Sequence, residues 1–251
     1  MQKAFNKLGV NIILKKIGYH YAPDYYGCNA HKQIDIRSIK EFSKIADAVV
    51  QSGRTYHYYD RLYTLYQALV NLRQRCKASE LFNAAEVGVY KGGTSYFISA
   101  FAKSMDIKAF SLHCFDTFEG HAAEDIRKNV DNTDLHKPNM FNDTDFESVK
   151  AYLSEFRNVF LYKGRCQDTC IQVELEKFHF VHVDMDLYEP IFFALNFFSS
   201  RLIIGGVIIV DDYGFKTCPG AKKAVDEFMM TRNDYFGMHL LTGQYIIVKT
   251  A

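Results

Sequence analysis

The sequence lacks an excess of charge of either sign. Its 30 Lys and Arg residues stand against 29 Asp and Glu residues, which gives a formal net charge of +1 over 251 residues. Without a surplus of basic residues, the chain has no overall field that favours nucleic acid or an acidic membrane surface. Nucleic acid is therefore not expected as a partner.

Closely spaced cysteine pairs are also missing, as are long apolar runs. Cys166 and Cys170 are the nearest neighbours among six scattered cysteines, and they lack the CxxC spacing of metal and redox sites. Free thiols are typical of a reducing compartment, so we expect a cytoplasmic protein. Segment 1–23 has too short an apolar run for a membrane span, and no small-residue cleavage site follows it. It predicts an amphipathic helix that packs on the domain or a partner subunit, with membrane-surface docking as the alternative.

The spacing of apolar residues in the sequence changes near residue 80. Before that point, segments 36–51 and 56–74 repeat apolar residues at steps of three and four, which predicts a helical region over residues 1–80. Its aromatic side chains could line a substrate pocket, but a stripe of this spacing is more often core or subunit interface. We expect a homodimer or higher oligomer. Over residues 81–251, short strand-like runs alternate with helix-like runs. The strand-like runs are 81–89, 109–116, 158–164, 178–184 and 206–212, and the helix-like runs are 95–105, 145–156, 189–202 and 219–230.

This alternation predicts a Rossmann-like, doubly wound α/β fold, with a mainly parallel sheet that helices cover on both faces. Residues 238–250 form two more strand-like runs without a helix between them, which predicts a C-terminal antiparallel hairpin and seven strands in all. The polar segment 120–144 is long for a loop, so we expect a lid-like insertion there. Its histidines, His121 and His136, could touch a substrate, but the sequence assigns no role to either.

Ligands of open parallel sheets bind beyond the carboxyl ends of the strands, so the residues after each strand matter most. After the first strand comes EVGVYKGGTS (86–95), whose glycines allow close backbone approach and whose Thr94 or Ser95 could cap the next helix. Its spacing differs from the dinucleotide fingerprint GxGxxG, and a tight turn without a ligand is the alternative. After the second strand, Asp116 is placed to accept hydrogen bonds from a ribose diol, unless it is a turn or cap residue.

Two later strands run directly into acidic residues. HVDMDLYEP (182–190) and GGVIIVDDYG (205–214) place Asp184, Asp211 and Asp212 at strand ends that converge if the strands are neighbours about 4.8 Å apart. Three carboxylates facing one point suit Mg²⁺ or Mn²⁺ rather than zinc. Adjacent aspartates face opposite sides of a regular strand, so the chain must turn after the strand, and helix caps or turn residues are the alternative.

Together with FDTFEGH (115–121) and YKGRCQDT (162–169), these segments resemble the macrocin O-methyltransferase family of class I S-adenosylmethionine-dependent methyltransferases, over roughly residues 54–249. The resemblance implies methyl transfer to a hydroxyl of a sugar, as part of a glycosylated small molecule or a polysaccharide precursor. It implies that Asp184, Asp211 and Asp212 hold Mg²⁺ or Mn²⁺. The residues expected at the cofactor are Glu86, Gly88, Gly92, Gly93, Thr94, Ser95, Asp116, Gly164, Gln167 and Asp168.

A sugar hydroxyl must lose its proton to attack the methyl group, and a metal ion makes that proton easier to remove. Asp186, two residues after Asp184, is the expected base. His182 lies on the same side by strand alternation and is a rival base, although a histidine inside an apolar strand is more often a satisfied core residue.

Two other classes of function remain open. Asp184-Met-Asp186 has the DxD spacing by which many glycosyltransferases hold a metal ion and a nucleotide-sugar. The glycine-rich turn followed by Asp116, together with the second acid pair, favours an adenosyl ligand instead. A catalytically silent nucleotide-binding domain is the other alternative, but unpaired carboxylates are expensive to keep for structure alone.

Overall fold

The computed structural model describes residues 35–76 and 81–251, so the amphipathic helix predicted in segment 1–23 lies outside the described residues. Residues Asp35–Ala251 form one compact unit. In the described part of this unit, no helix has both the length and the apolar composition needed to cross a membrane.

Two helices precede the sheet, as the apolar spacing predicted. After the short 3₁₀ helix η3 (Ile36–Ser38), α2 spans Lys40–Ser52 and α3 spans Tyr59–Arg75. Helix α2 buries Phe42, Ala46 and Val49 on one face, and α3 buries a leucine stripe that begins at Leu62. Both helices pack into the same hydrophobic cluster as the first strands of the sheet.

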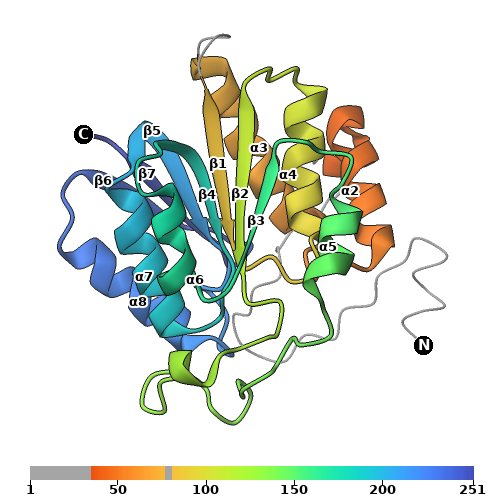
Figure 1. Ribbon diagram of the computed structural model, residues 1–251. Helices are drawn as coiled ribbons and strands as arrows, with labels where there is room; N and C mark the ends of the chain where they lie inside the picture. The colour runs from red at the N-terminus through yellow and green to blue at the C-terminus, as the bar shows by residue number, and fades with distance from the viewer. Residues whose placement is uncertain (1–34, 77–80) are drawn as a thin grey trace. The chain divides into compact units, whose positions relative to one another are not determined.

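Seven strands form one sheet in the order β3-β2-β1-β4-β5-β7-β6 (Figure 1). The bounds are β1 Phe82–Val87, β2 Phe110–Asp116, β3 Val159–Lys163, β4 Phe178–Val183, β5 Leu202–Val210, β6 Tyr235–His239 and β7 Tyr245–Lys249. Strands β1 to β5 pair in parallel, whereas β7 runs antiparallel to both β5 and β6. The doubly wound fold with a C-terminal antiparallel hairpin is therefore confirmed.

Helices cover both faces of this sheet (Figure 1). Helices α4 (Gly93–Ser104) and α5 (Phe146–Tyr152) lie with α2 and α3 on one face, and α6 (Cys166–Thr169), α7 (Tyr188–Ser199) and α8 (Pro219–Met230) lie on the other. Central strands β1 and β4 are buried along their whole length because both of their faces are covered.

Several boundaries differ from the prediction by three or four residues, and the start of β5 is one of them. Strand β5 begins at Leu202, where the sequence predicted the last residue of a helix, because Leu202 pairs with Phe178 at the start of β4. The register then shifts before Val207 pairs with Phe180, near Gly205, which has a φ of +79°. Gly205 and Gly206 thus interrupt the apolar pattern inside β5, and for this reason the sequence predicted a start of the strand at residue 206, four residues too late.

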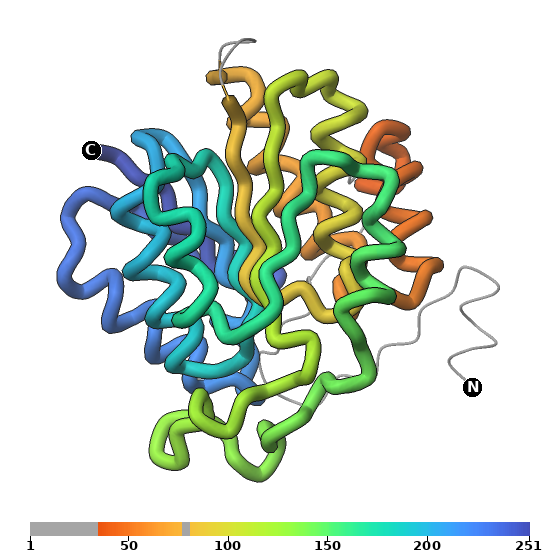
Figure 2. The backbone as a smooth tube through the Cα atoms, in the orientation of Figure 1, coloured from red at the N-terminus to blue at the C-terminus, as the bar shows by residue number. Residues whose placement is uncertain are grey.

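The strand register brings the acidic residues to one edge of the sheet. Val183 of β4 pairs with Val210 of β5, so Asp184 and Asp211 leave the sheet side by side. The Asp211 backbone N–H donates to the Val183 carbonyl over 2.9 Å, and the chain turns immediately afterwards. Segment 120–144 passes below these strand ends, as the yellow-green part of the tube in Figure 2 shows.

Candidate active site

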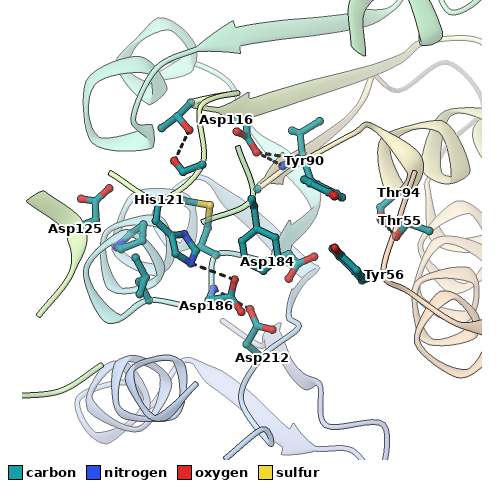
Figure 3. A pocket seen from close by; sticks show the side chains of 18 of the residues that line it. Thr55, Tyr56, Tyr90, Thr94, Asp116, His121, Asp125, Asp184, Asp186 and Asp212 are labelled. Carbon is teal, nitrogen blue, oxygen red and sulfur yellow. Dashed lines mark hydrogen bonds and ion pairs between the residues drawn. The ribbon is translucent and has the colours of Figure 1, made fainter. Parts of the chain in front are cut away.

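A cavity of about 300 Å³ opens at the carboxyl ends of the strands, where ligands of such sheets bind (Figure 3). It is lined from the turn after β1, the ends of β2 and β4, the turn after β5, segment 120–144 and the residues between α2 and α3. Of the predicted site residues, it receives Gly88, Thr94, Asp116, Asp184, Asp186 and Asp212.

The predicted metal ligands lie together at this edge. Asp184, Asp211 and Asp212 each offer a carboxylate oxygen within 4.8 Å of the others, and we refer to these three residues as the acid cluster. Because β5 ends at Val210, the chain is no longer extended at Asp211 and Asp212, and both carboxylates reach the same point. Asp186 adjoins them, since its backbone N–H donates to Asp212 over 3.0 Å.

Asp211 is the neutralised member of this group. Arg61 of α3 donates to its Oδ2, while Gln244 donates to its Oδ1 over 2.8 Å and His57 Nε2 lies 3.2 Å from the same oxygen. Burial works to raise the pKa of Asp211, but His57, His182 and Arg61 hold it well below its usual range. One lone pair on Oδ2 remains for a further partner.

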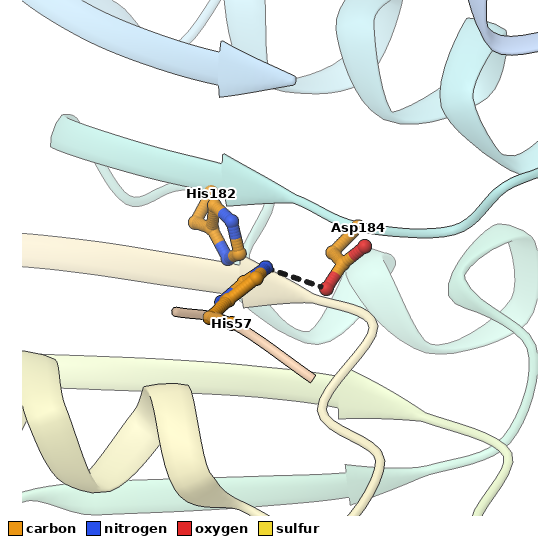
Figure 4. A group of neighbouring side chains, drawn as sticks. All are labelled: His57, His182 and Asp184. Carbon is orange, nitrogen blue, oxygen red and sulfur yellow. Dashed lines mark ion pairs between the residues drawn. The ribbon is translucent and has the colours of Figure 1, made fainter. Parts of the chain in front are cut away.

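His57 joins two of the acids, as Figure 4 shows for Asp184. Its Nε2 lies 3.3 Å from Asp184 Oδ2, and its Nδ1 hydrogen-bonds with Thr94 Oγ1 over 2.9 Å. Burial lowers the pKa of His57, yet Asp211 and Asp184 outweigh burial and raise it. Three of these partners, His57, Arg61 and Gln244, were not predicted, because nothing in their local pattern distinguishes them from ordinary loop, helix and turn residues.

Asp212 and Asp186 have the opposite environment. Burial and then the neighbouring acids raise the pKa of Asp212 well above its usual range. Burial and Asp184 raise the pKa of Asp186 to about 6. Over residues 35–76 and 81–251, neither carboxylate has an ion pair with Lys or Arg. Hard oxygen donors that lack a balancing charge fit a divalent cation such as Mg²⁺ or Mn²⁺.

The glycine-rich turn fits closely against this cluster. Gly88 has a φ of +93°, and a Cβ there would stand 1.8 Å from the Asp184 carbonyl oxygen. A Cβ on Gly93 would lie 2.7 Å from the Arg54 carbonyl oxygen. The absence of a side chain at Gly88 therefore lets the turn pack directly against the backbone of Asp184, and the same holds for Gly93 against Arg54.

Asp116 holds the turns after β1 and β2 together. Its carboxylate accepts backbone N–H bonds from Val89 over 2.7 Å, Tyr90 over 2.9 Å and Phe118 over 2.6 Å. Burial raises its pKa, and these N–H groups oppose that shift. The carboxylate lines the cavity and retains acceptor capacity for the ribose hydroxyl that the sequence predicted.

The remaining predicted residues lie behind the cavity wall or beside it. Glu86 accepts a hydrogen bond from Ser95 and pairs with His182 Nδ1 over 3.2 Å, and all three side chains are buried. Burial works to lower the pKa of His182, but Asp211 and Glu86 raise it to about 10, which makes the ring a buried cation rather than a free base. The other predicted residues outside the lining are Asp211, Gly92, Gly93, Gly164, Gln167 and Asp168.

Segment 120–144 forms one wall of the cavity and contains the short helix η4 (Ala123–Asp125). Asp125 accepts hydrogen bonds from Arg165 over 2.7 Å and from Gln167 over 2.8 Å. Asp131 accepts from the Tyr188 backbone over 2.9 Å. The segment predicted as a lid is thus fastened to the ends of α6 and α7.

Aromatic side chains form the wall between this segment and the N-terminal helices. The rings of Tyr56 and Tyr90 stack with centroids 5.4 Å apart, and Phe141 lies edge-on to both. Tyr56 is 62% exposed, so its ring is available to a ligand. We refer to Tyr56, Tyr90 and Phe141 as the aromatic wall.

The family model described as macrocin-O-methyltransferase (TylF) matches residues 53–236, more than half of the chain. The chain is 28% identical to demethyldecarbamoylnovobiocin O-methyltransferase of Streptomyces niveus over 152 residues, 57% of this chain and 56% of that protein. It is 26% identical to mycinamicin III 3''-O-methyltransferase of Micromonospora griseorubida over 172 residues, 63% of this chain and 66% of that protein. The chain therefore matches about half to two thirds of the length of these relatives.

Solved structures agree on the fold. The O-methyltransferase NovP superposes with a TM-score of 0.69 at 21% identity, over 79% of this chain and 83% of that chain. The calicheamicin methyltransferase CalS11 superposes with a TM-score of 0.60 at 16% identity, over 86% of this chain and 97% of that chain. With the family match covering both the glycine-rich turn and the acid cluster, the resemblance found in the sequence is confirmed, and the chain belongs to the macrocin-O-methyltransferase family.

Proposed function

We propose that the protein transfers a methyl group from S-adenosylmethionine to a hydroxyl of a sugar or glycosylated small molecule, with Mg²⁺ or Mn²⁺ at the acid cluster. The observation that carries the proposal is the convergence of Asp184, Asp211 and Asp212 beside the glycine-rich turn, in a chain of this family. Relatives named for novobiocin, tetracenomycin and mycinamicin derivatives support an acceptor of this chemical class.

The cofactor would lie along the turn after β1. Gly88 and Thr94 line the cavity at its methionine end, and Asp116 accepts from the ribose. The adenine end would extend toward Asp125 and Gln167, which are hydrogen-bonded to each other. The acidic lining also favours the positive sulfonium of the cofactor.

The metal ion would be held by Asp184, Asp211 and Asp212, and when bound it lowers the pKa of the acceptor hydroxyl. Asp186 is the residue that accepts the proton, because its carboxylate lines the cavity directly beside Asp212. Its backbone has a φ of +59°, a conformation that aspartate tolerates better than most residues and that turns the side chain toward the cluster. His182 would keep Asp211 and Glu86 ionised from inside the sheet.

The aromatic wall would bind the acceptor, since aromatic rings pack against the apolar face of a sugar. A nucleotide-sugar diphosphate fits this cavity less well. Arg54 and Arg61 are the only Lys or Arg residues among those described that line it, and both are engaged. Arg54 donates to the Lys91 carbonyl and to Ser148, while Arg61 pairs with Asp211.

A transfer assay tests the proposal. The purified full chain is incubated with S-adenosylmethionine and a panel of hydroxylated sugars and glycosides, with Mg²⁺, with Mn²⁺ or with chelator. We expect an acceptor to gain one methyl group by mass spectrometry, with S-adenosylhomocysteine formed in equal amount, and the reaction to stop on chelation. Transfer at an unchanged rate after exhaustive chelation would contradict the role of the metal.

A further inference from the structure

A second group of metal-ligating side chains lies next to the acid cluster. His121 Nε2 is 3.1 Å from His136 Nδ1 and 3.8 Å from Asp186 Oδ2 (Figure 3 shows His121 beside Asp186). Ligand atoms of all three residues lie within 4.8 Å of one another. His136 is 2% exposed, and the His121 side chain is 8% exposed. The methyl transfer proposed above, on which only the last part of this inference rests, uses Asp186 but neither histidine.

The hydrogen bonds of His136 define which of its nitrogens is free to bind a metal. Its Nε2 lies 3.0 Å from the Thr217 carbonyl oxygen, which can only accept, so Nε2 carries the proton. Its Nδ1 therefore presents a lone pair toward His121. Metal-bound histidines typically donate their second ring N–H to a backbone carbonyl or a carboxylate, which fixes the ring as the Thr217 carbonyl does here.

The other two groups are in forms suited to coordination. The His121 side chain is 8% exposed, and burial disfavours the charged imidazolium, which favours a neutral ring with a lone pair. Asp186 forms no ion pair with a Lys or Arg of the described ranges 35–76 and 81–251, and the Cys218 thiol donates to its other oxygen over 3.2 Å. Its left-handed backbone holds the carboxylate at this position at some energetic cost.

We propose that His121, His136 and Asp186 form a second metal site, which selects Zn²⁺. Two imidazoles and one carboxylate are the protein ligands of many zinc sites with an open position, whereas three carboxylates prefer Mg²⁺ or Mn²⁺. The open position faces the cavity, because His121 and Asp186 both line it. Binding places the His121 proton on Nδ1 in place of Nε2, so the two neutral rings release no proton.

Zinc at this site would affect the proposed reaction through Asp186. A carboxylate that coordinates Zn²⁺ is a weaker proton acceptor, and the ion lies between the aromatic wall and the acid cluster. Zn²⁺ in the presence of saturating Mg²⁺ is therefore expected to inhibit methyl transfer.

Direct metal binding tests the site without any need for activity. The full chain is stripped of metal, saturated with Mg²⁺ and titrated with Zn²⁺ against a chromophoric chelator, and Co²⁺ spectra report the geometry. We expect one Zn²⁺ per chain, weakened about 100-fold or more in His121→Gln and His136→Gln, since even the outer partners of metal ligands account for 10–100-fold in affinity. The control His239→Gln removes an exposed histidine on β6 and should bind Zn²⁺ like the wild type.

Zn²⁺ affinity equal to that of the wild type in both histidine variants would overturn the proposal, as would Zn²⁺ that Mg²⁺ displaces completely, because that ion would lie in the acid cluster. If His136→Gln does not fold, His121→Gln alone decides, since His121 is in a loop that lines the cavity. Zinc binding in a protein that shows no methyl transfer would count against the proposed function and leave this site intact.

Discussion

Asp116 at the end of β2 and Asp212 just after β5 lie at the same edge of the sheet, yet their surroundings are opposite. Asp116 after β2 is held by three backbone N–H groups. Asp212 after β5 accepts a single backbone N–H bond and otherwise faces other acids. A carboxylate whose partners are N–H groups organises turns and can accept from a neutral diol, whereas carboxylates that face one another are stabilised by a cation or by a shared proton. Along this edge of the sheet, the proposed cofactor region at β1 and β2 thus differs in its electrostatics from the proposed metal region at β4 and β5.

The largest expected effect is a difference in the free energy of unfolding between variants of two neighbouring acids, Asp211 and Asp212. Asp211→Asn removes the carboxylate that pairs with the partly buried Arg61 guanidinium and leaves His57 with Asp184 alone, so we expect a loss of about 3–5 kcal/mol in the free energy of unfolding. Asp212→Asn removes a carboxylate that repels its neighbours, so in metal-free buffer this variant should be as stable as the wild type or more so. Urea denaturation in metal-free buffer measures both, and equal destabilisation would contradict the assigned environments.

The second effect concerns activity. Asp184→Asn removes a proposed ligand at the partly exposed side of the cluster, and we expect kcat to fall by about 100-fold or more, because a metal ion supplies several kcal/mol of transition-state stabilisation. Cofactor affinity should stay within about twofold of the wild type, which is a change well below the 1.4 kcal/mol that corresponds to a tenfold difference. Asp106→Asn, an exposed acid after α4, is the matched control and should leave transfer unchanged. Wild-type rates in Asp184→Asn would remove Asp184 from the metal site.

A smaller effect is expected in the cofactor region. Asp116→Ala leaves three N–H groups without their charged acceptor, which should lower the free energy of unfolding by about 1–3 kcal/mol. It should also weaken S-adenosylmethionine binding by about tenfold or more, because the ribose loses its acceptor. Thermal denaturation with and without cofactor measures both changes. A variant that loses stability but binds the cofactor normally would show that Asp116 only organises the turns.

The smallest effect concerns the acceptor. Tyr56→Ala removes an exposed ring of the aromatic wall, and we expect the acceptor KM to rise about fivefold with kcat nearly unchanged, as a contact of about 1 kcal/mol implies. Tyr58→Ala is the matched control, because Tyr58 is 69% exposed and lies outside the cavity lining. Equal KM values for the two variants would remove the aromatic wall from acceptor binding.

Local sequence patterns predicted most of the fold and the acids of the site. Apolar runs that end abruptly in aspartate mark β4 and β5, and their parallel register brings the acids together without further information. The short helix α6 and the start of β5 were not predicted, because four residues and a glycine-interrupted strand carry little periodicity.

The partners of these acids could not be predicted in the same way. Arg61 is 150 residues from Asp211, and Gln244 reaches the same carboxylate from the C-terminal hairpin. Such contacts depend on tertiary packing, for which one sequence has no local signal. The pairing of Glu86 with His182 likewise depends on the register of β1 against β4, which periodicity alone does not determine.

Calorimetric titration with S-adenosylmethionine tests the separation of the two regions most directly. It compares the wild type, Asp116→Ala and Asp212→Asn, each with Mg²⁺ and then with chelator. We predict saturable binding to the wild type, binding within about twofold of it for Asp212→Asn, and binding about tenfold weaker or worse for Asp116→Ala. Equal losses in the two variants, or no binding to the folded wild type under either condition, would contradict the account.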